Sequence, residues 1–443
     1  KPLRCPKETR SYRKELEMHF TLPYGHHQKV KFDIPDRNVA FYVKRKGLPS
    51  VPDVRNSVVE AVRDPTGTPP LNKIAKKNDS IIVLVDDLTR PTPQKEILPV
   101  VLRELCSSRA NEDNIKIMIG LGTHRPMTDA EILDHLGPEV VERFGVSNHD
   151  FRDDRRLVNL GTTELGIPAL VNRAVVDADL VVSVGNIVPH NAAGWGGGGK
   201  MILPGVCGEE SVGILHIAAG RVKPIGSLVA TADNPMRRDI NTIARKAGLK
   251  AIVNTVLNNE DRVVRVFAGD PEQAFRDGVE TARQVFCRVV PELADVIVFS
   301  TYPADIDYWQ AMKALDFAHV GVRKDGTIVF ITPCPERISP THPSFRNRAT
   351  ESYASLLEAV DRDEIEDLPV AGALLMHAQM REHANIVCYS TGLTEEDKVD
   401  LGFEHASTIE EAIEIALKRH GERARVGVLE CGEVVPVAPR TNI

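Results

Sequence analysis

Residues 180–220 hold the densest group of side chains that could do chemistry. His190 follows a short apolar run, Lys200 ends a glycine tract, and His216 comes sixteen residues after that lysine. The β-branched run at 181–184 predicts a strand that is buried on both faces. The spacing from 209 to 219 predicts a helix, with Gly220 as its C-cap. Glycines at 194 and 196–199 would let the backbone approach a ligand closely.

The glycine tract resembles a phosphate-binding loop only in part. Gly194 to Lys200 fits G-x-x-x-x-G-K, but Met201 stands where that motif needs a hydroxyl group for magnesium. Pro204 and Gly205 also stop the helix that should follow at once. A glycine-rich surface linker is the commoner role for such a tract, but the apolar flanks and two nearby histidines argue against it. We therefore expect a ligand loop of another kind.

Polar residues also follow two earlier predicted strands. Asp87 and Arg90 come just after the apolar run at 80–85, and His124 comes just after the run at 115–119. Ligands of open parallel sheets bind outside the carboxyl ends of the strands. If all three strands share one sheet, these side chains and His190 converge on one rim. This convergence is the main argument for a site.

Strands alternate with helical segments along the whole chain, which predicts right-handed β-α-β units. The expected fold class is α/β, with two α/β domains of mostly parallel sheets and the active site in the cleft between them. The N-terminal domain would span 1–284 and the smaller one 285–423, while a strand within 424–443 would return to the first. In the second domain, Gln310 and Lys313 share one face of a helix predicted at 306–317. A ligand-binding role and a solvent-exposed role fit this helix face about equally.

Composition narrows the possible partners and location. The 443 residues carry a formal net charge of −7 without a basic patch, so we expect no nucleic-acid partner. No apolar run approaches the roughly 18 residues of a membrane span, and the charged start lacks an export signal, so we expect a cytoplasmic protein. The seven cysteines are widely spaced, which suits a reducing compartment. We expect Cys207 to be a small buried residue.

The candidate residues favour proton transfer over hydrolysis, because no hydroxyl or thiol stands beside a base in the pattern of a triad. Two histidines on opposite sides of a ligand can exchange the roles of general base and general acid. Asp87 could orient one of them, and Arg90 or Lys313 could hold an anionic substrate. His216 could bind a metal. Each histidine taken alone is more often a hydrogen-bonded core residue.

Several motifs in this order resemble the lactate racemase family of nickel-pincer enzymes. They are DDLTRP, GTHRPMT, NIVPHNAAGWGGGGKMILPG, the histidine at 216, DNPMRRD and YWQAMK. The resemblance runs from about residue 20 to the C-terminus. Its specificity lies in the offsets of 10 and 16 residues that separate His190, Lys200 and His216.

The resemblance implies a racemase or epimerase that inverts C2 of a 2-hydroxy acid by proton-coupled hydride transfer to and from a nickel-pincer nucleotide. That cofactor is a pyridinium-3-thioamide-5-thiocarboxylate mononucleotide, made by cofactor-synthesis enzymes. Lys200 would carry it through a thioamide, and His216 would be the nickel ligand. His124 and His190 would be the acid/base pair. The other implied contacts are Thr89, Gly198 and Gly199 with the cofactor, and Arg90, Gln310, Lys313 and Asp87 with the substrate, Asp87 also positioning His124.

One departure and two alternatives accompany this interpretation. Lactate-active family members carry a proline where this chain has Gly199, a change that would loosen the loop and bears on whether Lys200 is covalently linked. The family includes racemases and epimerases of several hydroxy acids, so the substrate could be lactate or a malate-like, aromatic or sugar acid. A nicotinamide-dependent 2-hydroxy acid dehydrogenase would need G-x-G-x-x-G directly before a helix, which the tract lacks. A non-catalytic nucleotide- or cofactor-binding protein of the same fold would not need both His124 and His190.

Overall fold

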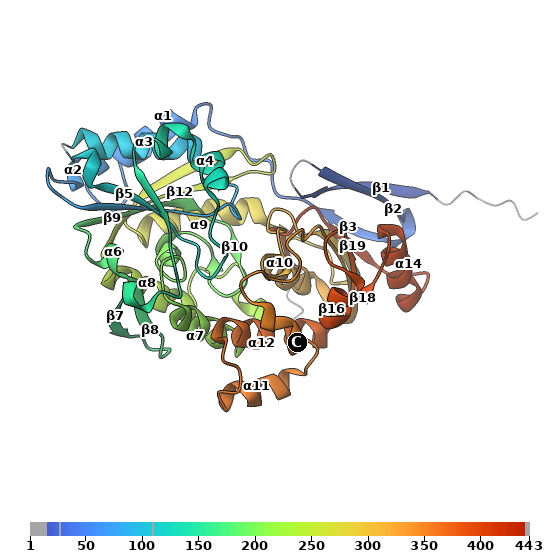
Figure 1. Ribbon diagram of the computed structural model, residues 1–443. Coiled ribbons are helices and arrows are strands. Elements are labelled where there is room, and N and C mark those ends of the chain that lie inside the picture. The colour runs from blue at the N-terminus through green and yellow to red at the C-terminus, as the bar shows by residue number, and fades with distance from the viewer. Residues whose placement is uncertain (1–15, 26–27, 109, 439–443) are drawn as a thin grey trace, which may run out of the picture.

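The computed structural model describes residues 16–25, 28–108 and 110–438. Within these ranges, two six-stranded sheets lie side by side, each with helices on both faces (Figure 1). The predicted α/β class with two mostly parallel sheets is confirmed. Cys5 lies outside the described residues, and the six described cysteines are free thiols. None of the described helices is long and apolar enough to span a membrane, and the cytoplasmic location stays a prediction.

The first sheet has the order β13-β12-β9-β4-β5-β6 and is parallel except where β13 joins β12. Its strands are β4 (Ile81–Val85), β5 (Ile115–Ile119), β6 (Gly145–Asn148), β9 (Leu180–Asn186), β12 (Leu249–Leu257) and β13 (Val263–Gly269). All five residues of β4 are buried, because apolar layers cover both faces. Helices α1 (Val54–Arg63), α2 (Leu71–Ile74), α3 (Gln94–Ser107), α4 (Asp129–Leu136) and α5 (Pro138–Val141) accompany one face, and α7 (Glu209–Gly220), α8 (Pro235–Lys246) and α9 (Gln273–Phe286) the other.

The order of this sheet reverses at β4. The chain goes from β4 to β5 and β6 on one side, then returns to β9 and β12 on the other. The loops after β4 and β9 therefore leave in opposite directions, and a crevice opens where they part. The β10 (Pro189–His190) and β11 (Gly194–Trp195) hairpin follows β9 at this point. The other small elements are α6 (Arg173–Val176), β7 (Leu157–Thr162) and β8 (Pro168–Asn172).

The second sheet is parallel throughout, with the order β18-β17-β16-β15-β19-β3. Its strands are β3 (Val39–Val43), β15 (Ala294–Ser300), β16 (Val322–Thr332), β17 (Asn385–Ser390), β18 (Glu404–His405) and β19 (Val426–Leu429). Helices α10 (Tyr308–Gly321), α11 (Tyr353–Asp361) and α12 (Leu368–His383) share one core, and α13 (Glu395–Asp400) lies near its edge. Helix α14 (Ile409–His420) and the hairpin of β1 (Glu17–Tyr24) and β2 (Gln28–Pro35) cover the other face.

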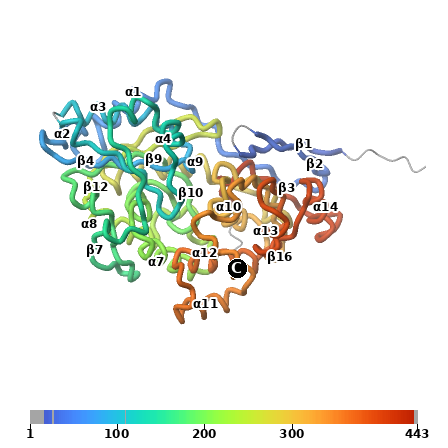
Figure 2. The backbone as a smooth tube through the Cα atoms, in the orientation of Figure 1, coloured from blue at the N-terminus to red at the C-terminus, as the bar shows by residue number. Residues whose placement is uncertain are grey.

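Strand pairing corrects part of the predicted domain division. Strand β19 joins the second sheet between β15 and β3, so the prediction that 424–443 returns to the first domain is wrong for β19. Within the described residues, β20 (Val435–Val437) does contact the first unit. It pairs with β14 (Cys287–Val289), and Val435 packs in the hydrophobic core of the first unit. Residues 16–43 were predicted within the first domain, but they form part of the second unit and lie beside α14 (Figure 2). Strand β19 pairs with one edge of β15 and β16 with the other, and β3 in turn pairs with β19. Strand β15 needs both partners because it is buried on both faces. The boundary at 284 stays a prediction.

The two units meet closely along α7 and α12. A side chain on Gly372 of α12 would put its Cβ 2.3 Å from the backbone carbon of His216 on α7. Gly220 is the last residue of α7 and Arg221 is the C-cap, so the predicted C-cap is wrong by one residue. The absence of a side chain at Gly220 lets α7 pack closely against Leu375 of α12. Helix α12 escaped prediction because twelve of its residues are buried, which leaves no polar stripe to reveal helical periodicity.

Candidate active site

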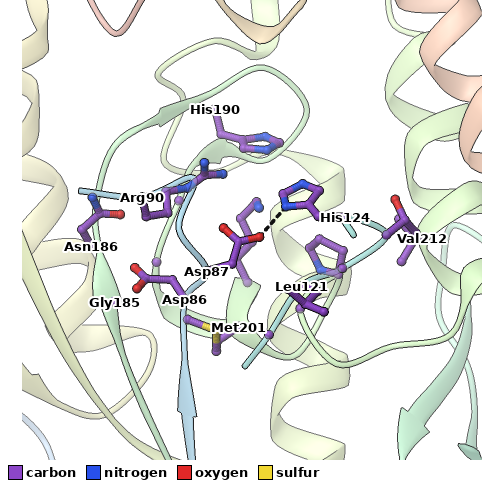
Figure 3. A pocket seen from close by; sticks show the side chains of 18 of the residues that line it. Asp86, Asp87, Arg90, Leu121, His124, Gly185, Asn186, His190, Met201 and Val212 are labelled. Carbon is purple, nitrogen blue, oxygen red and sulfur yellow. Dashed lines mark hydrogen bonds and ion pairs between the residues drawn. The ribbon is translucent and has the colours of Figure 1, made fainter. Parts of the chain in front are cut away.

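The predicted rim residues come together in one cavity, partly open to solvent. Loops after β4, β5 and β9 supply most of the wall, and α10 of the second unit closes it with Trp309 and Lys313. Figure 3 shows the side chains of Arg90, His124 and His190 directed toward a shared space. The cavity therefore lies at the carboxyl ends of the strands and between the two units, as predicted from the sequence, and the strand order places it at the reversal of the first sheet.

Asp87 and His124 form the most strongly coupled pair in the cavity. His124 Nδ1 lies 2.6 Å from Asp87 Oδ2, and the Thr89 backbone N–H donates to Asp87 Oδ1 at 3.1 Å. Burial opposes ionisation of Asp87, but His124 and Arg90 outweigh it and hold the pKa of this carboxyl well below its usual range. Burial, with Lys313 and Arg90, lowers the pKa of His124 to about 4 despite Asp87. At neutral pH the imidazole thus donates from Nδ1 and keeps a free lone pair on Nε2.

His190 is held differently, by backbone groups alone. It ends β10, which pairs with β11 in a short hairpin. The N–H groups of Ala192 and Ala193 each donate to His190 Nδ1 at 3.2 Å, so the neutral ring carries its proton on Nε2. Burial and the cations Lys200, Lys313 and Arg90 lower the pKa of His190 well below its ordinary value.

Lys200 ends the glycine tract in a single 3₁₀ turn, Gly198–Met201, and α7 begins only at Glu209. The exclusion of a phosphate loop is confirmed, because no helix follows the lysine directly. Burial lowers the pKa of the Lys200 amine well below its ordinary value, and Arg90, Lys313 and Arg237 add to the effect. Within the described residues this amine has no hydrogen-bond or ion-pair partner, and its lowered pKa favours the neutral, nucleophilic form.

The glycines also serve a purpose that was not predicted. Backbone of Gly196–Gly198 does line the cavity. Yet a Cβ on Gly197 would lie 2.9 Å from Asn254 Oδ1, and one on Gly198, where φ is +61°, would lie 3.0 Å from the Phe275 ring. Gly199 lies outside the cavity lining and packs on α8, where its Cβ would meet that of Ala244 at 2.9 Å. Most of these glycines therefore let the loop pack against the protein itself.

His216 lines the cavity from α7, as expected of a metal ligand. Its Nδ1 is buried without a hydrogen-bond partner. Burial lowers the pKa of His216 to about 3, with Lys313 and Lys200 contributing. The imidazole is therefore neutral and has an unused nitrogen, which is the state that binds a metal.

Of the remaining predicted residues, two line the cavity and two form hydrogen bonds to residues that line it. Arg90 and Lys313 line the cavity. Gln310 is buried behind it and accepts a hydrogen bond from Lys313 Nζ at 2.6 Å. Thr89 also lies outside the lining, and its hydroxyl donates to Asp87. Gln310 and Thr89 thus hold residues of the cavity wall.

Two functional residues were missed as such by the sequence analysis. Arg237, within the DNPMRRD motif, is almost fully buried and donates to the Trp195 carbonyl and, at 3.2 Å, to that of Gly197. Asn254, inside β12, accepts from the Gly198 backbone N–H at 2.9 Å. Both fix the loop that delivers Lys200. Only the motif at 233–239 marks Arg237, and nothing in the apolar pattern of β12 marks Asn254.

The cavity thus combines two differently held imidazoles, a buried lysine amine and two further basic side chains, Arg90 and Lys313. Asp86 and Asp87 are the acidic residues of the lining, and Asp87 is paired with His124. Arg90 and Lys313 can bind a small anion, and the imidazoles can take and return its protons. Fold and site together define a two-lobed α/β enzyme of acid–base chemistry on a small anionic substrate.

Comparisons with known proteins agree with this class. Residues 24–224 match the model of the lactate racemase N-terminal domain, and residues 289–437 match that of the C-terminal domain. A lactate racemase from Thermoanaerobacterium thermosaccharolyticum is 31% identical over 319 residues, 71% of this chain and 74% of that protein. A lactate racemase from Lactiplantibacillus plantarum is 27% identical over 383 residues, 85% of this chain and 89% of that protein.

Solved structures give the same result. The lactate racemase apoprotein from Thermoanaerobacterium thermosaccharolyticum superposes with a TM-score of 0.85 at 26% identity, covering 96% of this chain and all of that one. A Thermotoga maritima protein shares the fold, with a TM-score of 0.70 at 18% identity over 87% of this chain and 98% of that one. The chain belongs to the lactate racemase family, and it is an isomerase of the racemase type.

Proposed function

We propose that this enzyme inverts C2 of a 2-hydroxy acid, with a nickel-pincer nucleotide attached to Lys200. One observation carries the proposal: His124, His190 and Lys200, which are far apart in sequence, line a single cavity. The relatives are named lactate racemase, so lactate is the first substrate to test. Enzymes that synthesise the cofactor are the partners this proposal requires in the cell.

The residues present fit such a cofactor. Burial lowers the pKa of the Lys200 amine, and this amine has no partner among the described residues, which favours acylation of its nitrogen. The neutral imidazole of His216 has a free nitrogen and suits Ni(II). When bound, the nucleotide would supply acceptance and return of the substrate hydride, and the chain supplies position and proton transfer.

His124 is the base for one enantiomer. Asp87 keeps the proton of the ring on Nδ1, so Nε2 is free to take the proton from the substrate hydroxyl. The ionised carboxylate then stabilises the imidazolium that results. Thr89 fixes Asp87 through its backbone N–H and hydroxyl, so the pair is oriented before the substrate arrives.

His190 provides the opposite proton state. Its Nε2–H can donate to the oxygen at C2, because two backbone N–H groups occupy Nδ1. A substrate carboxylate held by Arg90 and Lys313 would offset the cations that depress the pKa of both histidines. Binding the anion therefore raises both pKa values toward neutrality, where each ring can exchange a proton.

The test is expression together with the cofactor-making enzymes, followed by intact-mass and metal analysis. We expect a nucleotide adduct that K200A abolishes, bound nickel that H216A loses, and conversion of one 2-hydroxy acid enantiomer into both. Deuterium at C2 should stay in the product; its washout into water would mean deprotonation at carbon and would contradict the proposal. Reduction of a nicotinamide dinucleotide would instead support the dehydrogenase alternative.

Metal analysis needs a matched control. Among the described residues, one group of three side chains could also hold a metal: Glu209, His342 and Asp367. None of them lines the cavity. H342A should therefore keep the nickel that H216A loses, and the reverse result would contradict the assignment of His216.

A further inference from the structure

A buried hydrogen bond joins the two units directly beside the candidate catalytic loop. Asn191, the residue after His190, donates from Nδ2 to Asp316 Oδ2 at 2.7 Å. Asp316 lies on α10, one turn after Lys313, and its side chain is completely buried. The helix that presents Lys313 to the cavity is thus also tied to the loop that presents His190.

Asn191 connects this contact to the His190 ring. Its Oδ1 accepts from the Ala192 backbone N–H at 2.9 Å, the same N–H that donates to His190 Nδ1 at 3.2 Å. A change in the orientation of the Asn191 amide would move or release this shared N–H. The contact with Asp316 fixes that orientation, because an amide whose nitrogen is held cannot flip its oxygen away.

Among the described residues, the bond from Asn191 is the one hydrogen bond that the Asp316 carboxylate makes. Its Oδ1 has no hydrogen-bond partner, and no ion pair joins it to the described residues. Burial raises its pKa to about 7, with Asn191 opposing. The Met376 thioether lies 3.8 Å from the same Asn191 nitrogen. On α10, burial raises the pKa of the Tyr308 hydroxyl, and Asp316 adds to this effect. An acid buried this deeply costs stability, so it needs a reason other than packing.

We infer that Asp316 is a positioning residue for His190 and acts through Asn191 across the interface between the two units. It sets which nitrogen of His190 carries the proton and where that proton points. The inference rests on the proposed function for the consequence in turnover, but the arrangement of His190 itself does not require cofactor or substrate.

Kinetics of four variants of the loaded enzyme test the effect on turnover. We expect D316A and N191A each to lower kcat about 10- to 100-fold, the range for a misplaced acid/base group, with KM nearly unchanged. D316N should stay within about threefold of the wild type, because its amide oxygen still accepts from Asn191. The double variant N191A/D316A should be no slower than the slower single variant. Wild-type kcat in D316A, or multiplied losses in the double variant, would overturn the inference.

A control separates this effect from weakened packing of α10. Leu315 is the neighbouring residue, and it is fully buried in the second core. L315A should lower the thermal midpoint at least as much as D316A while kcat stays at the wild-type value. A loss of kcat in L315A equal to that in D316A would show a structural role only, and would overturn the inference.

The second readout uses the apoprotein and stands apart from the racemase proposal. Histidine ring nitrogens labelled with ¹⁵N report the tautomer, and the H190N spectrum identifies the His190 signals. We expect the Nε2–H tautomer in the wild type and D316N, and a mixture of both tautomers in D316A and N191A. An unchanged tautomer in both alanine variants refutes the inference even if the enzyme racemises. A wild type that is loaded but inactive would refute the proposed function and leave this result standing.

Discussion

Replacing Asp87 by asparagine should reverse the proton arrangement of His124. The Thr89 backbone N–H, 3.1 Å from Oδ1, requires an acceptor at that position, so the amide oxygen of the variant stays there. The new NH₂ group then replaces Oδ2, which lies 2.6 Å from His124 Nδ1. An NH₂ group cannot accept a hydrogen bond, so the ring must turn its lone pair to Nδ1 and its proton to Nε2. His124 would no longer be a base toward the substrate.

The expected loss in kcat is about 10³- to 10⁴-fold, as when a catalytic histidine is held in the wrong tautomer. At about 1.4 kcal/mol per tenfold, this is roughly 4–5.5 kcal/mol of transition-state stabilisation. The assay follows one enantiomer at saturating concentration by chiral chromatography, with adduct mass and nickel content measured on the same sample. H124N should lose a similar factor. A loaded D87N enzyme within tenfold of the wild-type kcat would refute the reasoning.

Three further predictions follow from the same geometry. Burial and Arg90 lower the pKa of Lys313 to about 7, so this side chain loses its charge as the pH rises through 7. The kcat/KM for an anionic acid should then fall above pH 7 in the wild type but not in K313R, and equal profiles would contradict the role of Lys313. G199A brings its Cβ within 2.9 Å of that of Ala244 and should cost about 1–3 kcal/mol of unfolding free energy, measured in urea and relieved by A244G in the same chain. Burial lowers the pKa of His216 and His377 to about 3, whereas the unfolded chain protonates near pH 6.5, so stability should be lost as the pH falls through about 6.5; an equal thermal midpoint at pH 5 and pH 7.5 would contradict this.

The difference between the two histidines bears on how a racemase treats two enantiomers. His124 is held by a carboxylate and can accept a proton without disturbing its support. His190 is held by two N–H donors, which a proton on Nδ1 would repel. The apoprotein therefore favours a base at one wall of the cavity and an acid at the other. Substrate binding must shift this balance before the reverse reaction can run.

The sequence predicted the residues that line the cavity because the features that signal them are local. A β-branched run such as 181–184 forms a strand that is buried on both faces, and the polar residues that follow such runs must lie at the carboxyl end of a parallel sheet. Asp87, His124 and His190 could be predicted in this way. The capping box of Thr128 and Glu131, which starts α4, is equally local and was equally predictable.

The supporting residues depend on contacts between distant segments. Arg237 lies 40 residues from the Gly197 carbonyl to which it donates, and Asp316 lies 125 residues from Asn191. Hydrophobic periodicity does not indicate such a pairing, because in the local sequence each residue looks like an ordinary polar residue on a helix.

By itself, the sequence determined the main strands and the residue types at their carboxyl ends, because backbone propensity and apolar patterning act over a few residues. Only the tertiary structure decided that β3 and β19 complete the second sheet, that α10 closes the cavity, and that the glycines pack against the protein. Those outcomes follow from burial and hydrogen bonding among segments that meet only in the folded chain.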